Sequence, residues 1–248
     1  MSMRIKACPC AGALPRRRFL GTSLALGAAT FAAGGTFSEL AYADAMSKAQ
    51  REKLTPDDVL ALMKKGNKRF SRGTRQDHNY LAQQRASAGG QYPVAVLLSC
   101  IDSRAPAETI MDLRIGDVFN SRVAGNVESH DVLGGMEFAC KLSGAKVVLV
   151  MGHTACGAVK GAIDNAELGN LTALLAKIRP AVDATAYAGE RSSKNYPFVD
   201  AVARKNVELT IANIRRDSPV LAEMEKSGAI RIAGSMYDLQ TGVIEFFA

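Results

Sequence analysis

The 248-residue sequence lacks several features that would assign a protein to a class at once. Outside its N-terminal region it contains no uncharged stretch of 18 residues, which argues against a membrane-spanning helix there. It has no dense stripe of Lys and Arg with interleaved aromatic residues, so nucleic-acid binding is not expected. No G-x-G-x-x-G fingerprint follows an expected strand, and no internal repeat is present. What remains is a globular composition, 48% apolar, with enough length to bury a core.

The first 43 residues show the order of regions that is typical of an export signal. Three arginines, Arg16 to Arg18, precede the mildly apolar stretch Leu20–Ala33, and Ala41-Tyr42-Ala43 follows as a small-residue cleavage pattern. The run R-R-R-F-L resembles the twin-arginine export signal, R-R-x-F-L, which implies a periplasmic destination. A general secretory signal that is rich in Arg is the alternative. A membrane anchor is disfavoured because glycines interrupt the short apolar stretch, so we expect no stable membrane span once a signal peptide over residues 1–43 is removed.

The positive charge of the chain is partly a property of this segment. The whole sequence carries a formal net charge of +7, but residues 1–43 hold five basic side chains and one acidic one. The remaining chain therefore carries about +3. A charge this small gives no reason to expect an acidic macromolecule as a partner.

Cysteine is also scarce. Two of the five cysteines, Cys8 and Cys10, lie in the expected signal, which leaves Cys100, Cys140 and Cys156. An odd and small number of cysteines is a poor disulfide framework for an exported protein. These thiols therefore need another explanation, of which metal binding is the most specific.

Apolar runs alternate with helical segments from residue 55 onward. Thr55-Pro56-Asp57-Asp58 is typical of a helix start, with an N-cap, a proline in the first turn and acidic residues near the positive end of the helix dipole. This alternation predicts an α/β fold with a mostly parallel central β-sheet flanked by helices. We expect an N-terminal helical arm over residues 44–90 and an α/β domain over residues 91–248. Strands are expected at 92–100, 117–126 and 145–153, and residues 229–247 are expected to form a strand, a turn around 238–242 and a short strand. Helices are expected at 55–73, 81–88, 131–144, 170–179 and 197–226, with one more beginning at residue 156.

Two of the expected strands end in metal-ligand residues. Cys100 and Asp102 follow the first strand, and His153 and Cys156 follow the third. Because the carboxyl ends of parallel strands line one crevice, the two pairs are expected to meet. Two thiolates and one imidazole form a donor set that prefers zinc. The fourth position is either water, in a catalytic site, or Asp102, in a closed one.

Each of these residues alone has a more ordinary interpretation. An isolated buried Cys is usually inert packing, and an isolated His is more often a hydrogen-bonded core residue than a ligand. Only the combination of C-x-D-x-R with H-x-x-C is specific. Cys140 falls inside an expected helix beside apolar residues and is interpreted as packing. His78 and His130 lie in polar surroundings and are assigned no role.

The segments C-I-D-S-R and H-T-A-C-G, with G-D-V-F-N-S-R-V-A-G-N between them, resemble the β-class carbonic anhydrases. The resemblance is specific over residues 93–161 and more diffuse from Thr55 to the C-terminus. Val123 replaces the family's usual Asn, so we expect function to be kept but the local hydrogen bonds to differ from those of the family. The resemblance implies one Zn²⁺ per subunit, held by Cys100, His153 and Cys156, and reversible hydration of carbon dioxide to bicarbonate and a proton by a zinc-bound hydroxide. It also implies a homodimer or homotetramer.

The same resemblance assigns Asp102 and Arg104 to a catalytic dyad. Arg104 can hold Asp102 in a bidentate ion pair and keep it off the metal, so that Asp102 orients the attacking water. Two alternatives stay open at this point: hydrolysis of carbon disulfide or carbonyl sulfide on the same scaffold, and a non-catalytic zinc or redox protein that uses Cys100 and Cys156 as a switch. A purely structural site needs no such dyad, which favours the enzyme.

Overall fold

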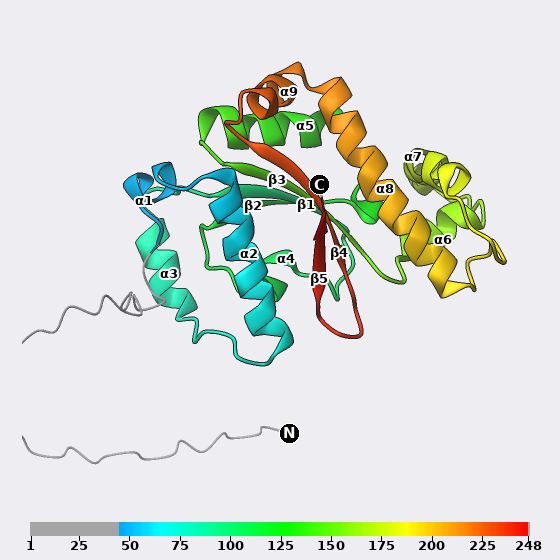
Figure 1. Cartoon of the computed structure of the whole chain (residues 1–248), viewed down its shortest axis with the longest axis horizontal. Coiled ribbons are helices and arrows are strands. Elements are labelled where there is room, and N and C mark those ends of the chain that lie inside the picture. Colours follow the sequence, from blue (N-terminus) through cyan, green and yellow to red (C-terminus); the bar gives the residue numbers. More distant parts are fainter. Residues whose placement is uncertain (1–44, 248) are drawn as a thin grey trace, which may run out of the picture. The chain divides into compact units, whose positions relative to one another are not determined.

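The computed structural model describes residues 45–247, which form a central sheet with helices on both faces (Figure 1). The expected signal peptide lies outside the described residues. Four parallel strands and one antiparallel strand make up the sheet, in the order β2-β1-β3-β4-β5. The strands are β1 (Ala95–Ser99), β2 (Val118–Arg122), β3 (Val147–His153), β4 (Arg231–Tyr237) and β5 (Ile244–Phe247). The predicted fold class is confirmed.

The two central strands, β1 and β3, are buried along their whole length. Their continuous apolar runs therefore alternate between two cores rather than between core and solvent. Val96 and Leu98 face one hydrophobic cluster, and Ala95 and Leu97 face the other. The pairing of Ser99 with both Arg122 and Met151 brings the carboxyl ends of β1, β2 and β3 to one edge of the sheet.

The larger of the two cores lies under the helices that follow β2. Apolar residues of these helices pack against Val96, Val148 and Ile232 of the sheet. The helices are α5 (His130–Glu137), the π-helix η2 (Phe138–Leu142), α6 (Gly157–Ile163), α7 (Gly169–Ala184), α8 (Tyr196–Asp217) and α9 (Pro219–Lys226). A 3₁₀ turn, η1 (Ala124–Asn126), joins β2 to this layer.

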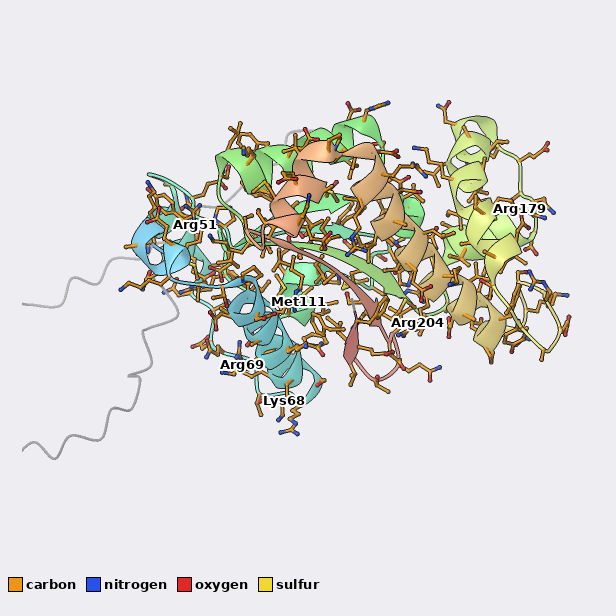
Figure 2. All side chains as sticks on the ribbon, turned by 45° about the horizontal axis from the view of Figure 1, so that its top comes forward. Arg51, Lys68, Arg69, Met111, Arg179 and Arg204 are labelled. Carbon is orange, nitrogen blue, oxygen red and sulfur yellow. The ribbon has the colours of Figure 1, made fainter. Side chains whose placement is uncertain are left out.

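The opposite face of the sheet is covered by the N-terminal arm. The arm consists of α1 (Lys48–Glu52), α2 (Pro56–Ser71) and α3 (Tyr80–Ser87), and the short helix α4 (Ala107–Ile110) packs beside α2. The predicted start of α2 is confirmed: Thr55 and Asp58 form a reciprocal capping box, and Pro56 occupies the first turn. Gly66 lets α2 approach Met111 closely, because a Cβ at Gly66 would lie 1.8 Å from the Met111 carbonyl oxygen. Figure 2 shows Met111 beside α2.

Some boundaries differ from those expected. The predicted helix over 197–226 is two helices, because Pro219 disfavours helical backbone at Ser218, which is extended and caps α9. The predicted strand over 117–126 ends at Arg122, where the chain enters the η1 turn. The helices α1 and α4 were not expected. None of the helices in the described part of the chain has the length and apolarity needed to cross a bilayer.

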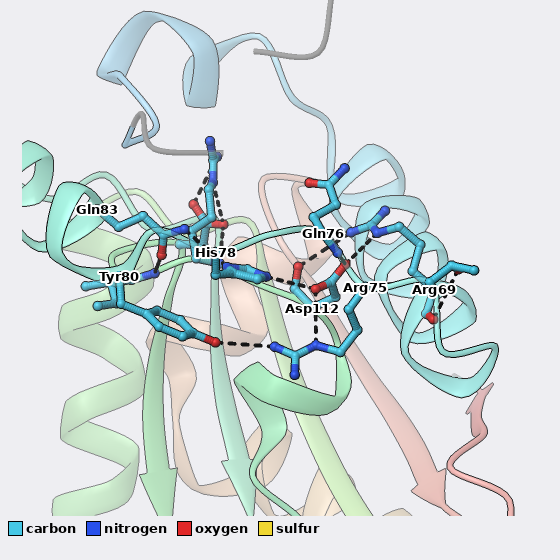
Figure 3. Close-up of polar contacts among 11 residues, drawn as sticks. Arg69, Arg75, Gln76, His78, Tyr80, Gln83 and Asp112 are labelled. Carbon is cyan, nitrogen blue, oxygen red and sulfur yellow. Dashed lines mark hydrogen bonds and ion pairs between the residues drawn. The ribbon is translucent and has the colours of Figure 1, made fainter. Parts of the chain in front are cut away.

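A buried ion cluster joins the arm to the segment after α4 (Figure 3). The fully buried Asp112 carboxylate accepts hydrogen bonds from Arg69 Nε at 2.5 Å and Arg75 Nε at 3.4 Å, and it lies 2.8 Å from His78 Nε2. Burial opposes ionisation of Asp112, but its hydrogen bonds with Arg69 and His78 outweigh this effect and lower its pKa. His78, which the sequence left without a role, is thus part of the link between arm and sheet.

Candidate metal centre

Three candidate ligands converge at the carboxyl edge of the sheet. Cys100 follows β1 directly, His153 is the last residue of β3, and Cys156 is the N-cap of α6. Because β1 and β3 are neighbours, Cys100 meets His153 and Cys156 although about fifty positions separate it from them in sequence. Their ligand atoms all lie within 4.8 Å of one another, and all three side chains are buried.

The orientation of His153 leaves one ring nitrogen available. Nδ1 lies 2.9 Å from the carbonyl oxygen of Thr154, which can only accept, so Nδ1 carries the proton. The buried Nε2 atom has no hydrogen-bond partner among the described residues. An unpartnered buried nitrogen is costly, and a His that donates through one nitrogen commonly binds a metal through the other.

The two thiols beside His153 are electrostatically coupled. The pKa of Cys100 lies below its ordinary value, chiefly because the Cys156 thiol donates a hydrogen bond to it, although burial acts in the opposite direction. The pKa of Cys156 is raised by that same interaction and by its burial. The pair therefore readily provides one thiolate, and a bound cation would favour the second. The backbone N–H of Gly125 donates to the Cys100 Sγ at 3.4 Å.

Cys140 is chemically different from this pair. It is a free, buried thiol inside η2, and burial raises its pKa to about 12. A thiol with that pKa stays protonated and unreactive at neutral pH. Its surroundings agree with the interpretation of Cys140 as a packing residue.

The Asp102 carboxylate is held at the rim of the cysteine and histidine cluster by Arg104. Arg104 Nε donates to Asp102 Oδ1 at 2.9 Å, Nη2 donates to Oδ2 at 2.7 Å, and the Arg104 backbone N–H donates to Oδ1 at 2.9 Å. These contacts lower the pKa of Asp102 well below its usual range, so it is ionised at neutral pH. Its Oδ2 lies 3.8 Å from His153 Nε2. Asp102 thus faces Arg104 while one oxygen stays close to the cluster.

A second arginine shapes the loop that carries Cys100 and Asp102. Arg122 Nε donates to the Cys100 carbonyl oxygen at 3.0 Å, and Nη2 donates to that of Asp102 at 2.6 Å. The sequence placed Arg122 in the motif that resembles R-N-A-G-N but assigned it no contact. Next to it, Val123 donates only its backbone N–H, to Ser99 at 3.0 Å, while its side chain packs against the core.

The donor set fits zinc. Two sulfur ligands and one imidazole nitrogen, preorganised in a buried cluster, match the soft and borderline ligands that zinc takes in a tetrahedral site. Three protein ligands would leave one position for water or substrate, which is typical of catalytic rather than closed structural zinc sites.

Comparison with known protein families shows which family the chain belongs to. The model of the family described as carbonic anhydrase matches residues 95–244, which span the parallel strands β1 to β4 and all three candidate ligands. The chain belongs to the carbonic anhydrase family. Carbonic anhydrases catalyse the reversible hydration of carbon dioxide to bicarbonate and a proton, and membership in the carbonic anhydrase family assigns that activity to this chain.

Curated relatives support the assignment to carbonic anhydrases over most of the chain. Carbonic anhydrase 2 of Mycobacterium tuberculosis is 34% identical over 186 residues, which cover 73% of this chain and 87% of that protein. The carbonic anhydrase of Mycolicibacterium smegmatis is 32% identical over 189 residues, covering 74% and 89% respectively.

Solved structures place this carbonic anhydrase in the β class. A β-carbonic anhydrase of Aspergillus fumigatus superposes with a TM-score of 0.58 at 28% identity, covering 77% of this chain and 89% of that one. A β-carbonic anhydrase of Sordaria macrospora, described as tetrameric, superposes with a TM-score of 0.57 at 27% identity, covering 64% and 82%.

Proposed function

We propose that this carbonic anhydrase works with one zinc ion per subunit, bound by Cys100 Sγ, His153 Nε2 and Cys156 Sγ. The observation that carries the proposal is the buried His153 Nε2, which has no hydrogen-bond partner among the described residues and lies in a cluster with two thiols. Zinc bound there would act as a Lewis acid and lower the pKa of water from about 15.7 toward neutrality. The family of the chain and the ligand chemistry both support this choice of metal.

Within this proposal, Asp102 orients the attacking water. A carboxylate that stays ionised at neutral pH can only accept hydrogen bonds, so Asp102 holds a water molecule in one direction without donating a proton to it. Arg104 occupies both oxygens of Asp102, which keeps the carboxylate from turning fully toward the three ligands. Arg122 keeps the loop backbone in place behind both residues.

Metal removal tests the proposal directly. We expect the purified protein to contain one zinc ion per chain, and a strong chelator to abolish carbon dioxide hydration until zinc is added back. Substitution of His153 by Ala should remove both the zinc and the activity. Metal analysis combined with stopped-flow hydration assays measures both quantities, and full activity in protein shown to be metal-free would contradict the proposal.

A homo-oligomer, dimeric or tetrameric, is the proposed assembly. The support is a tetrameric structural relative and the open edge of the sheet, where β2 pairs with β1 alone among the strands of residues 45–247. A cleft of about 430 Å³ lies beside β2, and the exposed side chains of Tyr80 and Ile115 line it. On β2 itself, Phe119 packs edge-to-face against the half-exposed Phe138. Apolar side chains beside an unpaired strand edge are typical of a surface that another chain covers.

Export to the periplasm by the twin-arginine route is the proposed localisation. The support is the R-R-R-F-L run followed by a weakly apolar stretch and a small-residue cleavage pattern. Transport in the folded state would allow the thiols to bind zinc before they meet oxidising conditions. If only the twin-arginine route is blocked, the precursor should stay in the cytoplasm, and mature protein still found outside would refute this route.

A further inference from the structure

The helix α8 contacts the strand that ends in His153 and the turn whose backbone faces Cys100. It packs along β3 and β4 and reaches the η1 turn between β2 and α5 (Figure 1). Two polar side chains of α8, neither of them singled out by the sequence, make these connections through backbone groups. One is Asn206, which is 2% exposed, and the other is the half-buried Asp200.

Asn206 supports the environment of the Cys100 sulfur. Its Nδ2 donates to the carbonyl oxygen of Gly125 at 2.7 Å, and the N–H of the same Gly125 donates to Cys100 Sγ at 3.4 Å. Gly125 has a φ of +70°, and a Cβ there would lie 2.4 Å from Ile178 Cδ1. Gly125 is therefore held between Asn206 and Ile178 in a position that aims its N–H at the sulfur.

Asp200 supports the turn that joins the other two ligands. Its Oδ1 accepts a hydrogen bond from the N–H of Ala155 at 2.7 Å. Ala155 lies between His153 and Cys156 and has a φ of +54°, a conformation that residues with a Cβ rarely adopt. Such a conformation persists only where surrounding contacts hold it, and the bond to Asp200 is one such contact. This turn brings His153 and Cys156 to the same point.

We propose that Asp200 and Asn206 are positioning residues for the metal centre, and that α8 thereby holds the two halves of the site in register. The inference rests on the proposed zinc site. Asn206 acts on Cys100 through Gly125: a donated N–H partly neutralises a thiolate and fixes its direction. Asp200 acts on His153 and Cys156 through the Ala155 peptide. Each of the two side chains reaches the candidate ligands through a hydrogen bond to the backbone of a neighbouring residue.

Four variants separate this role from general stability. N206L keeps the approximate size of the side chain but removes the donor, and D200A removes the acceptor, whereas D200N keeps an acceptor oxygen. N213A is the matched control, because Asn213 lies on the same helix but bonds to the side chains of Glu128 and Arg216 rather than to the backbone of Gly125 or Ala155. For each variant, zinc affinity is measured by chelator competition. The absorption spectrum of the cobalt-substituted protein reports the thiolate ligands, and thermal unfolding reports the fold.

We expect N206L and D200A to weaken zinc binding about 10-fold to 100-fold, as loss of ligand-orienting contacts commonly does. The cobalt–thiolate bands of N206L should shift, D200N should stay within a few-fold of the wild type, and N213A should match it. If N206L does not fold, the zinc affinities of D200A and D200N, which change only the half-buried Asp200, still test the inference. Unchanged zinc affinity and cobalt spectra in folded N206L or D200A would overturn the inference. A wild-type protein that binds no zinc would instead overturn the proposed function.

Discussion

The orientation of Asp102 determines whether its carboxylate binds Arg104 or approaches the candidate metal site. A carboxylate beside three candidate ligands could bind a metal ion held there, but the planar guanidinium of Arg104 offers it two parallel hydrogen bonds of 2.7 and 2.9 Å. The exposed Arg104 side chain gains little stability from this pair, because solvent screens it. The value of the contact is positional: it fixes an acceptor oxygen 3.8 Å from His153 Nε2.

Substitution of Arg104 by Ala tests this at the residue scale. We expect kcat/KM for carbon dioxide hydration to fall by about 100-fold or more, because the acceptor loses its fixed direction and is free to occupy the fourth metal position. Zinc content should stay at the wild-type level, since Arg104 contacts no ligand atom. Stopped-flow kinetics and metal analysis on the same sample measure the two effects. Wild-type turnover in R104A would remove the dyad from the mechanism.

At the scale of elements, the arm is joined to the sheet by packing and by charge. Met63 of α2 packs in the apolar core on one face of the sheet. Asp112, which has a positive φ just after α4, binds Arg69 near the end of α2 and His78 just before α3. A fully buried carboxylate is tolerated only when several donors surround it. The cluster therefore stabilises one docking geometry of the arm, and the loss of its central charge leaves Arg69 and Arg75 without their common partner (Figure 3).

The substitution D112N should lower the free energy of unfolding by about 2 kcal/mol at pH 7, because a neutral amide replaces a buried carboxylate that accepts charge-assisted hydrogen bonds from Arg69 and Arg75. The folded pKa of Asp112 is lowered, so its contribution is present above the unfolded value of about 3.9 and is lost as the pH falls through the folded value. The difference between wild type and D112N should therefore shrink below about pH 4.

Denaturant unfolding of both proteins between pH 3 and pH 8 measures this difference. D183N is the matched control, because Asp183 forms an exposed i,i+4 pair with Arg179, and it should change stability by less than about 0.5 kcal/mol. A D112N protein as stable as D183N at pH 7 would show that the cluster does not hold the arm.

At the scale of the whole molecule, the open edge of the sheet raises the question of assembly. β5 closes one side of the sheet as a short antiparallel strand, while β2 leaves its outer edge without a strand partner in the described chain. The cleft beside β2 includes Arg122, whose guanidinium also holds the loop of Cys100 and Asp102. A second copy bound at this edge would therefore lie next to the residues that shape the active site.

The substitution I115D places a charge in that cleft, where Ile115 is 42% exposed. We expect the wild-type protein to have two or four times the chain mass in light scattering after size-exclusion chromatography, and I115D to shift toward the monomer, because a buried unpaired carboxylate is costly at an interface. L168D is the control, since Leu168 is 71% exposed and lies outside the cleft. An I115D protein with the wild-type mass would exclude this edge as the interface.

The sequence alone determined the chemistry of the site. The C-x-D-x-R and H-x-x-C motifs at the expected strand ends indicated five site residues. Cys100, His153 and Cys156 were the candidate ligands, and Asp102 and Arg104 were the neighbouring ion pair. The apolar runs and the signals at Thr55 determined the parallel sheet and the start of α2. These features are local: each depends on residues within a few positions of one another, so periodicity and spacing reveal them.

Only the tertiary structure decided how that chemistry is held in place. The structure shows that Asp102 faces Arg104, a question that the sequence had left open. The loop contacts of Arg122 and the bonds of Asp200 and Asn206 to Ala155 and Gly125 depend on three-dimensional placement. The hydrogen bonds of Arg122, Asp200 and Asn206 join residues that lie 20 to 81 positions apart in the chain. An Asn or Asp in a helix has no local pattern that tells a buried positioning contact from a solvated surface. Its role follows from what the folded sheet brings opposite to it.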